Sequence, residues 1–320
     1  MSGRDGRPMK VTRGLAEHKE AAYPVLAIGN FDGQHRGHAT LLQAVVEMAA
    51  RHSGTPMVLT FDPHPLTVLS PGTPLRFLMN MEEKLQRFQD AGIEEVIFVE
   101  FNRAFAALMP EQFVAHVLRD GLHVWELYVG EHFAFGKGRA GSLKDLVSLG
   151  ANAGFGVHAV PAVRIDGEVV SSTRIRTLVQ DGEVAHAARF LGRPYMLGGT
   201  VIQGAQRGQA IGWPTANLRL PPDRVIPADG VYAARTRWKR RVLSSVSYIG
   251  TCPTFGPGER ALEVYVLDEQ LALYGEEIRV EFVERLREDL VFQSSEQLSA
   301  RIHQDVAHAR ETLKSAPPPE

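Results

Sequence analysis

Short apolar runs alternate with amphipathic segments in the first half of the chain. These runs are rich in Val, Ile and Leu and show little alternation with polar residues, which is typical of parallel strands buried on both faces of a sheet. We therefore expect a parallel sheet. Its strands are predicted at residues 25–29, 57–61, 95–99, 125–130 and 156–163.

The segments between these runs have the periodicity of helices. Residues 41–50 place Leu41 and Val45 on one face. Residues 80–92 begin with a capping-box pattern, and residues 110–121 begin with a proline and end with a glycine. Strands that alternate with helices in this way predict a doubly wound α/β domain.

The pattern changes near residue 187, where a stretch rich in Gly and Pro begins. Runs with strand composition follow, turn residues separate them, and an amphipathic segment at 295–313 closes the chain. We expect a small antiparallel β-barrel with a closing helix. The predicted strands are residues 230–238, 241–250, 261–268 and 277–286. The predicted domains are residues 1–186 (α/β) and 187–320 (all-β).

Composition narrows the function classes. A chain of 320 residues is longer than one core usually fills, so two domains are expected. The net charge of −2 gives no general attraction to nucleic acid or membranes, although it leaves room for a local basic site; protein partners are unknown. The single cysteine, Cys252, excludes an internal disulfide and favours a cytoplasmic protein. No secretory or membrane-spanning segment is predicted.

The stretch GNFDGQHRGH at 29–38 lies where the first predicted strand becomes a helix. Ligands of open α/β sheets bind at this edge, and the N–H groups of a helix start favour phosphate. His35 and His38 are one turn apart and suit charge stabilisation at a phosphorus centre. Taken alone, the motif also fits a glycine-rich turn with surface histidines, or a zinc pair that lacks a third ligand. The candidate nucleotide-binding residues are Gly29, Asn30, Phe31, Asp32 and Gly37.

Two further polar loops follow predicted strands and should reach the same edge. FDPHP carries Asp62 and His64; a turn stiffened by proline would explain its prolines but not both polar residues. GEHFAFGKGRAGS combines basic and aromatic side chains, which suit a phosphate and a flat ring, although a solvated loop is an even alternative. The candidate residues of this second loop are His132, Phe133, Phe135, Lys137 and Arg139.

SSTRIR at 171–176 follows the fifth predicted strand and opens a helix. Its hydroxyls can cap that helix and contact phosphate, although capping alone needs only one of them. All of these polar loops fall at carboxyl ends of strands, and this agreement is stronger evidence than any single loop. The candidates here are Ser171, Ser172, Thr173 and Arg176.

The stretch GQAIGWPTAN at 208–217 is a glycine-rich loop in the predicted barrel. Its amides could hold phosphate, and Thr215 and Asn217 offer oxygens to a hard cation. On these residues alone, a barrel-corner turn is the favoured interpretation of the loop. Glu263, inside an apolar strand, most simply marks an exposed strand face. The candidate ATP-binding residues are Gly208, Gly212, Pro214, Thr215 and Asn217.

The ordered set of motifs resembles one family. Residues 29–38 are similar to the histidine signature of nucleotidylyltransferases, and FDPHP, FGKGRAG, SSTRIR, LGRPY, GWPTAN, PTFG, LEVYVLD and LYG follow in order. From about residue 20 to about 312, the chain resembles the bifunctional bacterial riboflavin kinase/FAD synthetases.

The resemblance implies two activities, both with Mg²⁺. The first domain would transfer AMP from ATP to FMN, giving FAD and pyrophosphate, with His35 and His38 on the ATP phosphates. The barrel would phosphorylate riboflavin to FMN, with Thr215 and Asn217 holding Mg²⁺ and ATP, and Glu263 as the base. A nucleotidylyltransferase for another acceptor and a non-catalytic flavin-binding regulator are the alternatives. The chain departs from the family pattern at His132, Tyr248, Cys252 and Tyr265.

Overall fold

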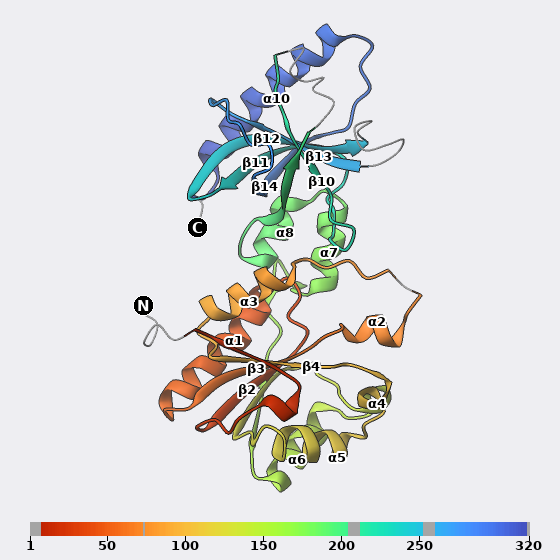
Figure 1. Cartoon of the computed structure of the whole chain (residues 1–320). Coiled ribbons are helices and arrows are strands. Elements are labelled where there is room, and N and C mark those ends of the chain that lie inside the picture. The colour runs from red at the N-terminus through yellow and green to blue at the C-terminus, as the bar shows by residue number, and fades with distance from the viewer. Residues whose placement is uncertain (1–7, 73, 204–211, 252–259, 319–320) are drawn as a thin grey trace. The chain divides into compact units, whose positions relative to one another are not determined.

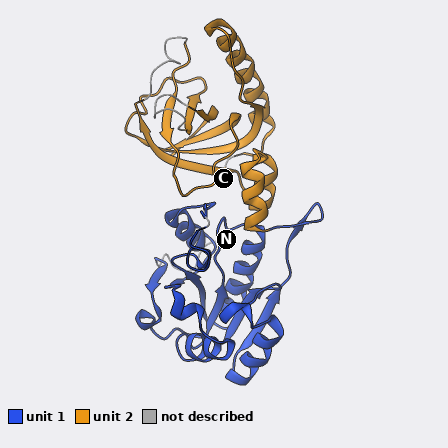
Figure 2. Cartoon of the chain, turned by 90° about the vertical axis from the view of Figure 1, so that its right-hand side faces the viewer, with its two compact units in different colours: residues 1–170 blue, residues 171–320 orange. Residues whose placement is uncertain are grey.

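The computed structural model describes residues 8–72, 74–203, 212–251 and 260–318. Contacts divide the chain into two compact units, Met1–Val170 and Ser171–Glu320 (Figure 2). The boundary between the two units lies earlier in the chain than the domain boundary predicted at residue 187. The predicted boundary says where the second domain can fold on its own, and it stays a prediction. The units are described separately below.

Unit 1 is built on a six-stranded sheet in the order β1-β4-β3-β2-β5-β6, with every neighbouring pair parallel. Figure 1 labels β2, β3 and β4 of this sheet. The parallel sheet is confirmed, and one strand more than expected, β1, lies at its edge. The strands are β1 (Lys10–Arg13), β2 (Pro24–Ile28), β3 (Thr55–Phe61), β4 (Glu95–Val99), β5 (Glu126–Gly130) and β6 (Gly156–Val160).

The central strands are buried on both faces, as their unbroken apolar runs predicted. In β2, Leu26 and Ile28 pack into one hydrophobic cluster, while Val25 and Ala27 pack into another on the opposite face. The amphipathic faces of α1 (Arg36–Arg51) and α3 (Met81–Asp90) cover the second cluster. Helices η2 (Phe113–Arg119) and α6 (Leu143–Ala153) cover the first. The edge strands are less buried, with β1 mostly exposed and β6 mostly half-buried.

The helices of unit 1 connect these strands. The predicted capping box is present at the start of α3, whereas the helix predicted at 110–121 begins as α5 and continues as a π-helix, η2. A short hairpin of β7 (Arg164–Ile165) and β8 (Glu168–Val169) follows β6. The helices are η1 (Leu15–Glu17), α1 (Arg36–Arg51), α2 (Pro65–Leu69), α3 (Met81–Asp90), α4 (Arg103–Ala106), α5 (Pro110–Gln112), η2 (Phe113–Arg119), η3 (Lys137–Arg139) and α6 (Leu143–Ala153).

Unit 2 is a closed antiparallel barrel in the order β10-β13-β12-β11-β14-β9. The four predicted strands are present, together with β9 and β10, which the sequence pattern did not reveal. The strands are β9 (Tyr195–Ile202), β10 (Ala216–Arg219), β11 (Gly230–Trp238), β12 (Arg241–Thr251), β13 (Arg260–Val266) and β14 (Glu277–Glu288).

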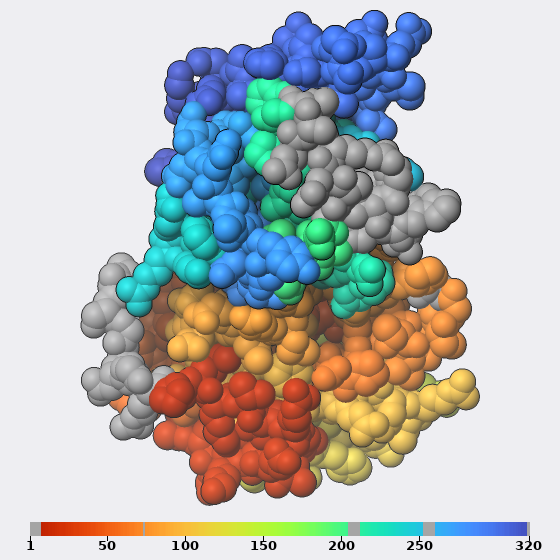
Figure 3. Space-filling model, turned by 45° about the horizontal axis from the view of Figure 1, so that its top comes forward, coloured from red at the N-terminus to blue at the C-terminus, as the bar shows by residue number. Residues whose placement is uncertain are grey.

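Helices α7, α8 and α10 accompany the barrel in the described part of the chain. α7 (Ser172–Gln180) packs on α8 (Val184–Leu191), and α8 packs on β14 and β9. The predicted closing helix is α10 (Ser295–Ser315), which lies on the surface of the unit (Figure 3). Its buried Asp305 accepts hydrogen bonds from the guanidinium of Arg287 on β14 at 2.9 and 3.1 Å. In the described part of the chain, no helix is long and apolar enough to span a bilayer.

Candidate active sites

The glycine-histidine stretch joins β2 to α1. β2 lies between β3 and β5, where the strand order reverses, and its carboxyl end is therefore where ligands of such sheets bind. Phe31 and Gln34 have positive φ values of 51° and 34° beside Gly33 at 80°. A bulky residue in this region is strained, and full burial of the Phe31 ring against His38 and Phe88 offsets that strain.

His35 is the N-cap of α1. Its Nδ1 accepts the backbone N–H of His38 at 3.3 Å, which leaves Nε2 as the ring nitrogen that can donate. A Cβ at Gly37 would lie 3.2 Å from two atoms of the His35 ring, so a larger residue there would press on that ring. His35 therefore offers an Nε2–H donor.

The rings of His35 and His38 stack with centroids 3.7 Å apart. Enclosure of its ring by protein, the neighbouring His35 and the charge of Lys84 hold the pKa of His38 well below its ordinary value. The Nδ1 of His38 is buried and has no hydrogen-bond partner among the described residues. His38 is thus uncharged at neutral pH, and its ring and that of His35 can each donate an N–H to an anion.

Neighbouring residues fix the loop. Asp32 is buried and both of its carboxylate oxygens accept the backbone N–H of Leu78, at 3.0 and 3.2 Å. The Asn30 carbonyl accepts a hydrogen bond from Nζ of Lys84 at 2.9 Å, and Asn30 Oδ1 is a buried oxygen without a partner in the described structure. Sequence reasoning missed Lys84, although its position four residues before the buried Phe88 places it on the inner side of α3.

FDPHP follows β3, as expected, and its two polar residues have local partners. Asp62 forms an exposed ion pair with Arg13 at 3.4 Å and acts electrostatically on Lys84. His64 is the N-cap of α2, and its Nδ1 accepts the N–H of Leu66 at 3.2 Å. Their role in ligand binding stays a prediction.

The loop after β5 is partly structural. Phe135 belongs to the hydrophobic core and packs on Phe133, so its ring is not a free platform for a flat ligand. His132 is exposed beside Glu131, with 79% of its side-chain surface accessible. Lys137 and Arg139 are exposed in η3. Phosphate binding by these residues stays a prediction.

SSTRIR opens α7 after the β7–β8 hairpin, rather than directly after a sheet strand. Ser171 caps the helix, since its Oγ accepts the N–H of Arg174 at 3.2 Å. Ser172, Thr173 and Arg176 lie in the first turns of α7. The helix is part of unit 2, and the assignment of these four residues to the nucleotide site of unit 1 stays a prediction.

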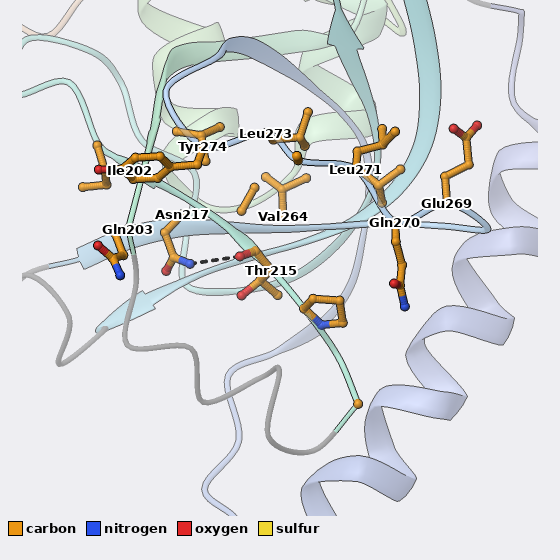
Figure 4. Close-up of a pocket in the computed structure, with 16 residues that line it drawn as sticks. Ile202, Gln203, Thr215, Asn217, Val264, Glu269, Gln270, Leu271, Leu273 and Tyr274 are labelled. Carbon is orange, nitrogen blue, oxygen red and sulfur yellow. Dashed lines mark hydrogen bonds between the residues drawn. The ribbon is translucent and has the colours of Figure 1, made fainter.

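The barrel holds a pocket of about 750 Å³ (Figure 4). Thr215 and Asn217 line it, and the Nδ2 of Asn217 donates to the Thr215 carbonyl at 3.2 Å. Ile202 and Tyr274 lie at one end of the pocket, and Gln270 lies toward the other (Figure 4).

Glu263 lies beside these pocket residues. It pairs directly across the strands with Asn217, and the Thr215 hydroxyl donates to its Oε2 at 3.4 Å. The Oδ1 of Asn217 is buried and lacks a partner in the described residues. Hydroxyl, amide and carboxylate oxygens therefore gather at one point, as suits a hard cation and a proton acceptor.

The remaining predicted barrel residues are placed in part. Gly212 and Pro214 line the pocket, whereas Gly208 and Cys252 lie outside the described residues. Sequence reasoning missed the role of Trp213. Its Nε1 donates to Ser299 of α10 at 3.3 Å, and its ring packs edge-on against other aromatic rings, including Tyr265 at 5.0 Å.

Comparison with known proteins identifies the family. Residues 17–174 match the family described as FAD synthetase, and residues 191–313 match the family described as riboflavin kinase. The chain is 37% identical over 306 residues to the bifunctional riboflavin kinase/FMN adenylyltransferase of Escherichia coli strain K12, covering 95% of this chain and 97% of that protein. The chain belongs to the bifunctional riboflavin kinase/FMN adenylyltransferase family.

Another member of this family and a solved structure also match this chain over nearly its whole length. The Bacillus subtilis strain 168 protein of the same name is 34% identical over 296 residues, covering 91% of this chain and 93% of that protein. A crystal structure titled macrolide-efflux protein from Streptococcus pneumoniae matches with a TM-score of 0.87 and 29% identity, covering 95% of this chain and 99% of that one. The fold is thus shared along nearly the whole length.

Proposed function

We propose that this protein makes FAD from riboflavin in two ATP-dependent steps, with riboflavin kinase activity in the barrel and FMN adenylyltransferase activity in unit 1. The observation that carries the proposal is that one chain matches both family models, each on the unit that holds the corresponding polar cluster. The imidazole pair lies in the first match, and the oxygen cluster of Thr215, Asn217 and Glu263 lies in the second.

In the kinase step, the riboflavin 5′-hydroxyl oxygen attacks the γ-phosphorus of ATP, and ADP leaves. The hydroxyl proton passes to the carboxylate of Glu263, which the cross-strand pairing with Asn217 holds on a rigid strand. Thr215 and Asn217 would hold Mg²⁺ through their side-chain oxygens, and the buried, unpartnered Oδ1 of Asn217 fits that assignment. When bound there, Mg²⁺ would neutralise charge on the ATP phosphates.

In the adenylyl step, a phosphate oxygen of FMN attacks the α-phosphorus of ATP, forming the FAD pyrophosphate bond while inorganic pyrophosphate leaves. The Nε2–H of His35 and the ring of His38 donate hydrogen bonds to phosphate oxygens as charge builds up. No covalent enzyme intermediate is needed, because positioning and charge stabilisation account for most of such a transfer. The serines, Thr173 and Arg176 of α7 would hold the phosphate chain.

Incubation of the purified protein with riboflavin, ATP and Mg²⁺, followed by flavin chromatography, tests the proposal. FMN followed by FAD is the expected result. Bound riboflavin without either product would instead support a flavin-binding regulator, and FMN without FAD would point to a different adenylyl acceptor. The chelator EDTA should abolish both products. A cytoplasmic location and the absence of nucleic-acid or membrane partners stay predictions.

A further inference from the structure

Lys84 connects α3 to both ends of the histidine loop. Its Nζ donates to the carbonyl of Asn30 at 2.9 Å, and its own carbonyl accepts a hydrogen bond from Nε2 of Gln34 at 2.9 Å. One residue of α3 thus holds the two positions that bracket the strained backbone between β2 and α1. A structural clamp would account for these two bonds, but it would not require a positive charge.

The charge of Lys84 is incompletely balanced. Burial lowers the pKa of the Lys84 ammonium, against the opposing influence of Asp32 and Asp62. Both carboxylates have other partners, since Asp32 accepts from Leu78 and Asp62 pairs with Arg13. No ion pair of Lys84 within 4.0 Å is found in the described parts of the chain. A largely desolvated cation without a close anion is costly, and binding of an anion would relieve that cost.

The surroundings of the ammonium also favour an anion. The Asn30 carbonyl accepts a hydrogen bond from one of the three N–H groups of the Lys84 ammonium. The titratable groups that lower the pKa of His38 are His35 and Lys84. His38 itself has a buried Nδ1 without a partner in the described structure. The lysine charge and the imidazole pair therefore act at one place, at the edge of the sheet where the nucleotide is proposed to bind.

We propose that Lys84 is a phosphate-binding residue of the adenylyl-transfer site, whose ammonium stabilises the polyphosphate chain of ATP and the pyrophosphate that leaves. This inference rests on the proposed function. Negative charge shifts onto the leaving pyrophosphate as its bond to the α-phosphorus breaks. A fixed ammonium beside that group stabilises the transition state more than the bound substrate, so both binding and rate depend on it.

Lys84→Met tests this proposal, with Lys84→Arg as the charge-conserving variant and Lys144→Met, an exposed lysine of α6, as the matched control. FAD synthesis from supplied FMN should fall about 10- to 100-fold in kcat/KM for ATP in Lys84→Met, the usual effect of losing one charge-assisted hydrogen bond. Lys84→Arg should retain part of the activity. Riboflavin phosphorylation by the same samples should be unchanged, because the barrel is untouched.

An NMR titration of the His38 imidazole distinguishes an effect of the Lys84 charge from a purely structural role of Lys84. Because Lys84 helps to lower the pKa of His38, Lys84→Met should make this ring titrate at a higher pH, whereas Lys84→Arg should not. Wild-type FAD synthesis in Lys84→Met would overturn the inference. The inference would also be overturned if both Lys84 variants lost FAD synthesis equally while the pH at which His38 titrates did not change. That result would mean that Lys84 acts only as a structural clamp. A wild-type protein that makes no FAD would instead refute the proposed function.

Discussion

The imidazole rings of His35 and His38 stack with their centroids 3.7 Å apart and their planes 13° apart. Two protonated rings at this separation would repel each other strongly, and His35 Nδ1 is already an acceptor for the N–H of His38. His38 therefore meets a polyphosphate as a neutral donor. Phosphate binding then favours protonation, because an anion beside an imidazole raises its pKa.

Substitution of either histidine should separate the two activities. His35→Ala or His38→Ala should lower FAD synthesis from FMN on the order of a hundredfold or more, because the lost donor acts mainly in the transition state. FMN formation from riboflavin should persist in both. Flavin chromatography measures both products in one reaction, and His116→Ala, an exposed histidine of η2, is the control. Unchanged FAD synthesis in the double variant would make the imidazoles a surface feature.

The lowered pKa of His38 predicts a pH effect on stability. The unfolded chain protonates this histidine near 6.5, whereas the folded chain does so only at a lower pH. Below 6.5 the unfolded state therefore binds more protons, and stability falls as the pH falls. Between pH 7 and pH 5, the unfolding midpoint of unit 1 should drop less in His38→Asn than in the wild type. Equal drops would show that His38 titrates normally in the folded protein.

The packing of α7 and α8, which precede the barrel, predicts where a fragment with riboflavin kinase activity can begin. α8 buries Val184, Ala187, Phe190 and Leu191, and it packs on β14 and β9. A fragment of residues 187–320 removes the first turn of α8, including Val184, whose burial contributes about 1.5–3 kcal/mol. Residues 171–320 should therefore unfold at higher urea than residues 187–320, and both should phosphorylate riboflavin while folded. Equal midpoints would show that α7 and the start of α8 do not stabilise the barrel.

Trp213 should position the pocket loop, since the residues after it, Pro214 and Thr215, line the pocket. Trp213→Ala removes the ring contacts and the bond to Ser299, and it should raise the KM for ATP in FMN formation about tenfold, as expected for losing such packing. Trp213→Phe should have a smaller effect. Initial rates at varied ATP give the measurement, with the exposed Trp125→Ala as control. An unchanged KM would mean that the loop holds its shape without α10.

The sequence predicted the parts of the fold that depend on local pattern. The runs around Leu26 and Leu59 are apolar without alternation because both faces of the sheet are covered, and this can be read from single strands. β1 and β10 are four residues each, too short to show a period. Placement of α7 and α8 with the barrel depends on contacts between distant segments, which no local pattern contains.

For the site residues too, features that depend on local sequence were predicted and features that depend on distant contacts were not. The histidine pair was found because its chemistry and its strand-to-helix position are both visible in sequence. Lys84 was missed because the role proposed for it depends on a bond to Asn30, 54 residues away. Phe135 packs into the core, which an aromatic residue in a loop gives no local sign of, and its contact with a ligand stays a prediction.

Glu263→Gln tests the central claim, that one chain carries two separate sites, most directly. The amide keeps the size of the side chain but cannot take the proton of the riboflavin hydroxyl. FMN formation should fall roughly 10²- to 10⁴-fold, the usual range for losing a general base. Riboflavin binding, followed by flavin fluorescence, should persist, and Glu284→Gln on β14 should phosphorylate riboflavin normally.

The decisive measurement supplies each flavin separately to Glu263→Gln and to His38→Ala and chromatographs the products. Glu263→Gln should convert FMN to FAD at nearly the wild-type rate while making almost no FMN from riboflavin, and His38→Ala should do the reverse. Loss of both activities in either folded variant would contradict separate sites. Wild-type phosphorylation by Glu263→Gln would contradict the assignment of the base.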